Sequence, residues 1–567
     1  MSVKKDQKNP KVIELKRFTL KGECIDLSHQ GIGVVKIDNI PYFVNNLLPG
    51  EKAKINFEIK ESNKFGYGEV VERFNDNPNR IKPICNNFLN CGGCDLMHMN
   101  YQMQLDFKKN MVNQTFKRLG HLNFQIEEII GADNPYQYRN KIQVPYRMNN
   151  KGKIVCGFYQ KKSHDIVEFK ECFIQNDLMT NIAIFIRNLL NEYKVSAFNE
   201  VNNLGVFKHL LIRKTSNNKY MVVFIINGNE KNNNIDLFKK FVDKVISRYP
   251  EVESVIVNYN YKNSNVILGN EYDCLYGKDY LIENILGLNY KMSHKAFFQI
   301  NHAQTEKLYT VALEYANVTK NDVVMDCYCG VGTIGLLASQ KAKKVVGVEI
   351  IPEAIENAKE NALLNNITNA EFIVGAAEEV INDLKDIDVL IVDPPRKGLH
   401  TKLVDTILNS DIQRVVYVSC DCATMARDLA LLTEKYDIVK GIAVDLFPQT
   451  SDVETVVLLS HKSNNSKVNV NLNFDNEKGK KLIKKVVEDV DSRKEPEGAS
   501  YPEIKEYILN KYNVKVSSLN IAQIKTKYGI IERECYNKPK SENSRQPNCT
   551  KEKEEMIVDA LKHFKMI

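Results

Sequence analysis

The feature that most constrains the fold is a series of short apolar segments between residues 323 and 420, each followed by polar residues. The segments are Val323–Cys327, Lys344–Glu349, Glu371–Val374, Asp388–Val392 and Arg414–Ser419, and stretches of helical composition such as Pro352–Asn365 separate them. Strands that alternate with helices are typical of a parallel β-sheet. Ligands bind such sheets beyond the carboxyl ends of the strands. We therefore expect an α/β fold with its ligand site at that edge.

Several polar side chains fall at this edge, among them Asp326, Glu349 and Asp393. The first strand runs into the loop Cys329–Gly335, whose glycines let the backbone approach a ligand closely. Glu349 follows Asp326 by 23 residues and can accept hydrogen bonds from ribose hydroxyls. The loop lacks the lysine and hydroxyl residue that cradle phosphates, which favours S-adenosylmethionine over NAD or ATP. The alternative to a functional role for Asp393-Pro394-Pro395 is a rigid turn, since proline restricts the residue before it.

A thiol and a carboxylate follow the last of these strands. Cys420 caps the strand, and Glu454 comes 34 residues later. A cysteine that closes a strand is most often a small buried apolar residue, and a single glutamate beside a strand is usually solvated. Their spacing alone is weak evidence for chemistry.

The segment 293–460 resembles the catalytic domain of the RNA 5-methyluridine (uracil-5) methyltransferases, which act on tRNA and large-subunit rRNA. The matching elements are Phe297–Asn301, Asp326–Gly332, Asp393–Gly398, Val418–Cys420 with Ala423–Thr424, and Val453–Val456. The resemblance implies a Rossmann-like class I methyltransferase domain and an S-adenosyl-L-methionine methyl donor. It implies cofactor contacts at Gln299, Tyr328, Glu349 and Asp393, with Cys420 as nucleophile and Glu454 as base.

The chemistry of this family needs both groups. A thiolate adds to C6 of uracil, C5 then attacks an electrophilic methyl group, and a base must remove the C5 proton before the thiol leaves. One departure leaves a question open. The family commonly has Asn-Pro after the nucleophile, whereas this chain has Asp421-Cys422, so that Cys422 is the alternative thiol. Ser419 and Ala423-Thr424 align with the family pattern, and this alignment favours Cys420 as the nucleophile.

A second cysteine group lies far upstream. Cys85, Cys91 and Cys94 are spaced by five and two residues, and Cys172 is the expected fourth member, with Cys156 as its competitor. Close cysteines in a chain expected to be intracellular point to a metal rather than to disulfides. A zinc site would need a second matched pair, and four thiolates suit an iron–sulfur cluster. The pattern resembles the [4Fe–4S] cluster of the family's 23S rRNA-methylating branch, and its spacing argues against radical chemistry.

The remaining sequence predicts further domains. Short strands within residues 12–74 predict a small β-barrel that resembles a TRAM (OB-like) RNA-binding module: Phe18–Leu20, Gly33–Ile37, Pro41–Val44, Ala53–Phe57 and Gly66–Val71. We expect a mixed α+β domain that holds the cysteines and grips RNA at 75–290, the methyltransferase domain at 291–462, and a polar linker at 463–479. A helical C-terminal extension should follow at 480–567, with helices near Lys480–Asp491, Tyr501–Lys511, Ser518–Lys527 and Glu552–Phe564.

Composition agrees with a globular protein rather than a membrane protein. Hydrophobic residues make up 43% and charged residues 26% of the 567 residues, and the net charge is +7. No apolar run approaches the roughly 20 residues that span a bilayer, and the start lacks a signal-peptide core. We expect a cytoplasmic monomer with RNA, most simply 23S rRNA, as partner and no membrane contact. The alternatives are a tRNA uracil-5 methyltransferase and a catalytically idle RNA-binding or ribosome-assembly factor.

Overall fold

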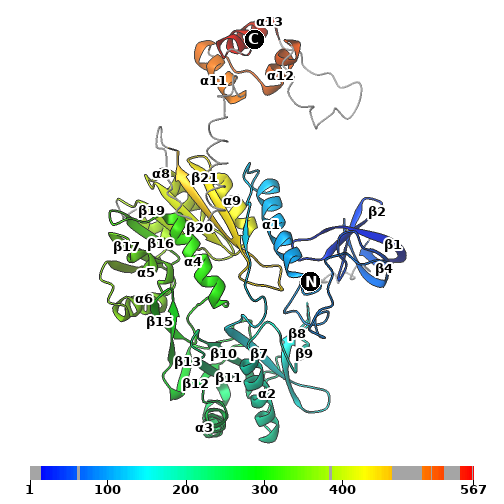
Figure 1. Ribbon diagram of the computed structural model, residues 1–567, viewed down its shortest axis with the longest axis vertical. Coiled ribbons are helices and arrows are strands. Elements are labelled where there is room, and N and C mark those ends of the chain that lie inside the picture. Colours follow the sequence, from blue (N-terminus) through cyan, green and yellow to red (C-terminus); the bar gives the residue numbers. More distant parts are fainter. Residues whose placement is uncertain are drawn as a thin grey trace, which may run out of the picture. The chain divides into compact units, whose positions relative to one another are not determined.

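The computed structural model describes residues 15–60, 64–161, 163–381, 386–462, 501–512, 514–528, 550–564 and 566. The chain divides into two compact units, Met1–Asn464 and Asn465–Ile567 (Figure 1). Within the described ranges, every helix is too short or too polar to cross a membrane.

The first unit begins with a closed barrel of five strands, drawn in blue in Figure 1. The strands are β1 (Leu15–Leu27), β2 (Gly33–Ile37), β3 (Ile40–Val44), β4 (Lys52–Lys60) and β5 (Gly66–Arg73), in the order β1-β2-β3-β5-β4. Side chains along β4 alternate, so that Ala53, Ile55 and Phe57 fill the barrel while the lysines face solvent. The expected small barrel is confirmed.

A seven-stranded sheet follows the barrel, in the order β13-β12-β11-β10-β7-β8-β9. Its strands are β7 (Lys141–Met148), β8 (Ile154–Tyr159), β9 (Ile166–Glu168), β10 (Phe207–Lys214), β11 (Tyr220–Asn227), β12 (Val252–Asn260) and β13 (Glu271–Gly277). Helices α2 (Asp177–Glu192) and α3 (Lys231–Arg248) share one apolar core with this sheet, and the short 3-10 helix η1 (Gly228–Glu230) joins β11 to α3. Residues of the opposite face join the core of the neighbouring sheet through the hairpin β14 (Tyr280–Ile285) and β15 (Leu288–Ser293).

The eight-stranded sheet carries the polar edge predicted above, in the order β18-β17-β16-β19-β20-β22-β21-β6. Its strands are β6 (Ile129–Ile130), β16 (Val323–Cys327), β17 (Lys344–Glu349), β18 (Ala370–Val374), β19 (Val389–Val392), β20 (Arg414–Ser419), β21 (Tyr436–Val444) and β22 (Glu454–His461). The five predicted strands are parallel, as expected. Beyond β20 the sheet continues with strands that the sequence did not predict, since β22 pairs antiparallel with β20 and forms an antiparallel hairpin with β21.

Both faces of this sheet are covered, which explains its apolar strands. Helices α4 (His302–Ala316), α5 (Thr333–Ser339) and α6 (Pro352–Leu364) share a core with one face. The other face packs against α1 (Tyr101–Arg118), α7 (Ala377–Val380), α8 (Thr401–Asn409) and α9 (Cys422–Leu432). The result is a three-layer α/β domain.

The second unit contains α11 (Tyr501–Tyr512), α12 (Ser518–Lys527) and α13 (Lys551–His563). Its core includes Ile504, Ile508, Ile521 and Ile557, and the Asp559 carboxylate accepts hydrogen bonds from Tyr507, Lys511 and Tyr512. Three of the four helices expected in the extension are therefore present. The fourth, near Lys480–Asp491, and the linker 463–479 lie outside the described residues.

Candidate active site

A cavity of about 50 Å³ opens at the carboxyl ends of β16 and β19. Its lining residues are Phe297, Phe298, Tyr309, Asp326, Tyr328, Cys329, Gly330, Val331, Thr333, Ile334 and Asp393. The loop after β16 makes this hollow because Tyr328, Gly330 and Gly332 adopt φ values of +63°, +55° and +81°. A Cβ atom on Gly332 would lie 2.9 Å from the Phe372 ring, so that only glycine fits there. This cavity lies at the sheet edge where the strand pattern predicted a ligand site.

The expected cofactor residues divide into two groups. Tyr328 and Asp393 line the cavity. Glu349 and Gln299 do not line the cavity. Both form hydrogen bonds with neighbouring segments. The Glu349 carboxylate accepts hydrogen bonds from the backbone N–H groups of Gly330 and Ile351, at 3.3 Å and 3.0 Å, and so supports the glycine loop. The carbonyl oxygen of Gln299 accepts a hydrogen bond from Asn140 at 3.0 Å.

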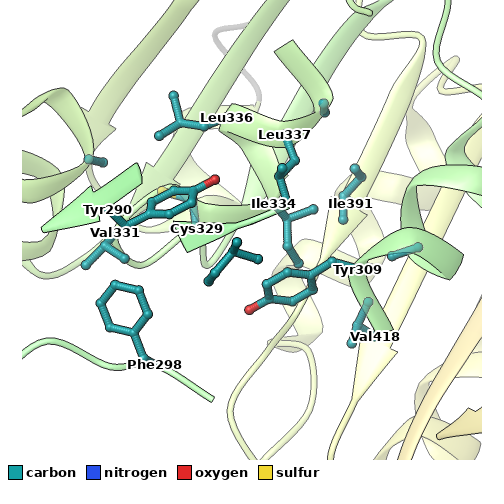
Figure 2. Close-up of a cluster of buried hydrophobic side chains, with 14 of the residues drawn as sticks. Tyr290, Phe298, Tyr309, Cys329, Val331, Ile334, Leu336, Leu337, Ile391 and Val418 are labelled. Atoms are coloured by element: carbon teal, nitrogen blue, oxygen red, sulfur yellow. The ribbon is translucent and has the colours of Figure 1, made fainter. Parts of the chain in front are cut away.

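Aromatic rings form the apolar side of the cavity. Figure 2 shows Tyr290, Phe298 and Tyr309 gathered with Cys329, Val331 and Ile334. Phe297, by contrast, is 69% exposed at the cavity. Sequence reasoning missed Tyr309, because an aromatic residue at helical spacing in α4 is indistinguishable from a core residue. The signal that could have found it is its place on α4 directly after the Phe297–Asn301 segment.

Cys420 and Glu454 are brought together by strand pairing. Ser419, the last residue of β20, pairs with Thr455 of β22, so that Cys420 and Glu454 are the next residues at the strand ends. The Glu454 side chain is buried, and its Oε2 atom has no hydrogen-bond partner. A buried carboxylate oxygen without a partner is costly. This oxygen is therefore free to accept a hydrogen bond or a proton.

Burial and neighbouring acids set the proton affinities of this pair. Burial raises the pKa of the Cys420 thiol to about 12, with Glu454 and Asp393 adding to the rise and the Arg396 guanidinium opposing it. Burial also raises the pKa of Glu454 well above its usual value. The pKa of Asp393 rises to about 7 for the same reason. Since Asp393 also lines the cavity, the cavity and the thiol–carboxylate pair form one site.

The second thiol of the segment lies elsewhere. Cys422 is the first residue of α9, and its Sγ atom lies 3.6 Å from the Thr115 hydroxyl on α1. Asp421 is the N-cap of α9, and its side chain accepts hydrogen bonds from the backbone N–H groups of Ala423 and Thr424. Asp421 therefore supplies a favourable N-cap side chain at the position where the family commonly has asparagine, and Cys422 contacts the α1 helix.

The upstream cysteines surround a second cavity, of about 40 Å³. Cys85, Cys91, Cys94 and Cys172 all line it, together with Arg139 and apolar side chains such as Phe88 and Phe158. Burial raises the pKa of Cys172 to about 11 and that of Cys94 further, and the neighbouring thiols add to the rise for Cys94. Cys156 is buried in the core of the seven-stranded sheet. The structure thus brings together the four predicted cysteines and leaves out the competitor.

Four cysteine thiols form the donor set of this cavity. Among the described residues, no three His, Cys, Asp or Glu side chains stand close enough to share one metal ion. The thiolates of a four-iron cluster bind different irons and need not converge on one point. Arg139 lines this cavity, and its buried Nε atom has no hydrogen-bond partner. A cation there would balance the negative charge of four thiolates.

Fold and site together define the class. A glycine-loop cavity at the edge of a parallel sheet, with a thiol and a carboxylate beside it, is that of an α/β methyltransferase. A crystal structure of the Pyrococcus abyssi tRNA (uracil-54, C5)-methyltransferase in complex with S-adenosyl-L-homocysteine is similar to this chain. The TM-score is 0.63 and the sequence identity 28%, over 77% of this chain and 99% of that one.

The sequence profile of the tRNA (uracil-5-)-methyltransferase family matches residues 100–462, and the chain belongs to that family. It is an RNA methyltransferase by this membership. An uncharacterized RNA methyltransferase of Staphylococcus aureus is 40% identical over 78% of this chain and 98% of its own length. A relative with the same description from Oceanobacillus iheyensis is 39% identical over 80% of this chain and 99% of its own length.

Proposed function

We propose that the protein methylates C5 of a uridine in RNA through a covalent bond between Cys420 Sγ and C6 of the uracil. The observation that carries the proposal is the position of Cys420 beside the unpartnered Glu454 oxygen, at the cavity where Asp393 lies. A nucleophile and a base are the two groups that this reaction requires of the protein.

The first step is the addition of the thiolate to C6. The thiol must release its proton to water to form the attacking thiolate, because burial raises its pKa to about 12 in the free protein. The Arg396 guanidinium favours the thiolate, since this cation lowers the pKa of Cys420. Addition makes C5 a nucleophile toward a methyl group placed in the cavity.

The later step is the removal of the C5 proton. Glu454 is the proposed base, because its buried Oε2 atom has no hydrogen-bond partner and burial increases the proton affinity of its carboxylate by raising the pKa. Loss of the C5 proton restores the double bond and expels Cys420. Without the base, the methylated uracil would remain bonded to the enzyme.

S-adenosyl-L-methionine is the proposed methyl-donating substrate, and it would supply the electrophilic methyl group in the cavity. Tyr328 and Asp393 are proposed as contacts from the cavity lining, and Glu349 and Gln299 as further contacts from its surroundings. The aromatic side chains Phe298 and Tyr309 would exclude water from this methyl group. The solved relative binds the demethylated product S-adenosyl-L-homocysteine, which agrees with this choice.

We also propose that Cys85, Cys91, Cys94 and Cys172 hold a [4Fe–4S] cluster. Their shared cavity, its apolar wall and the Arg139 cation support this assignment. We also propose a division of the chain into five parts. Residues 12–74 form a TRAM-like RNA-binding barrel, 75–290 grip RNA, 291–462 catalyse methyl transfer, 463–479 link, and 480–567 form an extension.

The RNA substrate is proposed to be 23S rRNA, because four clustered cysteines resemble the rRNA-methylating branch. Transfer RNA is the second candidate, favoured by the solved tRNA (uracil-54, C5)-methyltransferase and by the name of the family. Mapping of 5-methyluridine in rRNA and tRNA from cells lacking the protein decides between them. Loss of the modification from 23S rRNA alone is the expected result, and loss from tRNA alone would overturn the choice.

A further inference from the structure

The loop between β21 and β22 leads directly into Glu454, and its backbone is bound by other segments along its length. Five consecutive carbonyl oxygens, from Asp445 to Gln449, each accept a hydrogen bond from outside the hairpin. The donors are Gln304 Nε2 to Asp445, Asn301 Nδ2 to Leu446, Lys108 Nζ to Phe447, Tyr138 Oη to Pro448, and the backbone N–H groups of Asp95 and Leu96 to Gln449. We call residues 445–449 the clamped segment.

A buried ion pair lies at the centre of this arrangement. The Lys108 ammonium group on α1 lies 2.5 Å from the Asp445 carboxylate, and both side chains are fully buried. The same ammonium group donates to the Phe447 carbonyl at 3.0 Å. The Tyr101 hydroxyl donates to the other oxygen of Asp445 at 2.8 Å and accepts from the backbone N–H of Ala132 at 2.7 Å. Helix α1 therefore holds Asp445 and Phe447 in place.

Burying such a pair is expensive, and it is weak evidence for added stability. The pair does fix the relative position of α1 and Asp445, because each buried charge is neutralised only when the other is in place. Gln449 has φ of +70°, an unfavourable conformation for a residue with a side chain. Its N–H donates to the Gln104 side chain on α1 at 3.0 Å. The clamped segment is thus held in a conformation that it would not adopt by itself.

We propose that Lys108 and Asp445 are positioning residues for the methyl-transfer reaction, and that their ion pair fixes the clamped segment so that Glu454 stands beside Cys420. This inference rests on the proposed function. Neither residue lines the cavity, and neither needs to contact the RNA or the methyl donor. Because the clamped segment precedes the base and not the nucleophile, its loss should affect removal of the C5 proton more than addition of the thiol.

The test compares Lys108→Met with Lys109→Met under multiple and single turnover. Lys109 is the matched control, since it is the next residue of the same helix and donates only to an exposed carbonyl, that of Glu127. For Lys108→Met we expect kcat to fall by about 100-fold, the effect of misplacing a catalytic group by about 1 Å. Methyl transfer in a single turnover should persist, and methylated RNA should remain bonded to the protein on a denaturing gel. Lys109→Met should behave as the wild type.

Tyr101→Phe is the milder second variant, and it decides the question if Lys108→Met fails to fold. It removes one hydrogen bond to Asp445 and should give a smaller accumulation of the same bonded RNA. Equal losses of methyl transfer and of RNA release, without bonded RNA, would overturn the inference and leave Lys108 a purely structural residue. Failure of the proposed function has a different signature, because Glu454→Gln would then accumulate no bonded RNA either.

Discussion

At the scale of single residues, the site depends on a thiol and acids whose proton affinities are raised by burial. The Cys420 thiol has a pKa of about 12, and the pKa values of Asp326 and Asp393 rise to about 7. A thiol with a raised pKa is mostly protonated at neutral pH, so that its thiolate fraction increases about tenfold for each pH unit. The Arg396 guanidinium lowers the pKa of Cys420 and so opposes the effect of burial.

The pH dependence of bond formation tests this account. We expect the rate at which the protein traps RNA containing 5-fluorouridine to rise as the pH increases above neutral. Arg396→Met should slow trapping at every pH, because the thiol pKa rises further when the cation is removed. Lys397→Met, the neighbouring exposed cation, serves as the control. A rate that is independent of pH and unchanged in Arg396→Met would contradict the assigned role.

At the scale of elements, the polar strand ends could be predicted, because parallel strands present their carboxyl ends at one edge. The residues Asp326, Asp393 and Cys420 were found in this way. The pairing of β6 with β21 could not be predicted, since Ile129 and Ile130 meet Ala443 and Val444 only through the tertiary fold. The cap role of Asp421 was also not predicted, although aspartate is a preferred N-cap residue.

The cysteine cavity yields a prediction at this scale. Protein purified without oxygen should be brown and contain about four irons per chain. Replacing Cys85, Cys91, Cys94 or Cys172 by alanine should remove the iron and the colour, measured by absorbance and iron analysis. Cys156→Ala is the matched control, because that thiol is buried in the core outside the cavity. Colourless wild-type protein with stoichiometric zinc would refute the cluster.

At the scale of the whole molecule, the chain consists of a unit that ends at Asn464 and a second, helical unit. The family profile matches only residues 100–462. The sequence predicted three of the helices of the second unit, but the role of that unit could not be predicted, since no chemistry-bearing motif distinguishes it.

A chain truncated after Asn464 should therefore fold and methylate RNA, because the cavity, the thiol–carboxylate pair and the clamped segment all lie within the first unit. Its thermal unfolding midpoint and its single-turnover rate should match those of the same unit in the full chain. A truncated protein that binds the methyl donor normally but no longer modifies RNA would show that the second unit takes part in substrate binding.

The most direct measurement of the central claim is the yield of protein bonded to RNA on a denaturing gel during turnover. Cys420→Ala should form no bonded RNA and no methylated product. Glu454→Gln should transfer the methyl group and then accumulate bonded, methylated RNA, since the C5 proton stays in place. Cys422→Ala should keep activity. Bonded RNA formed by Cys420→Ala but not by Cys422→Ala would contradict the assignment of the nucleophile.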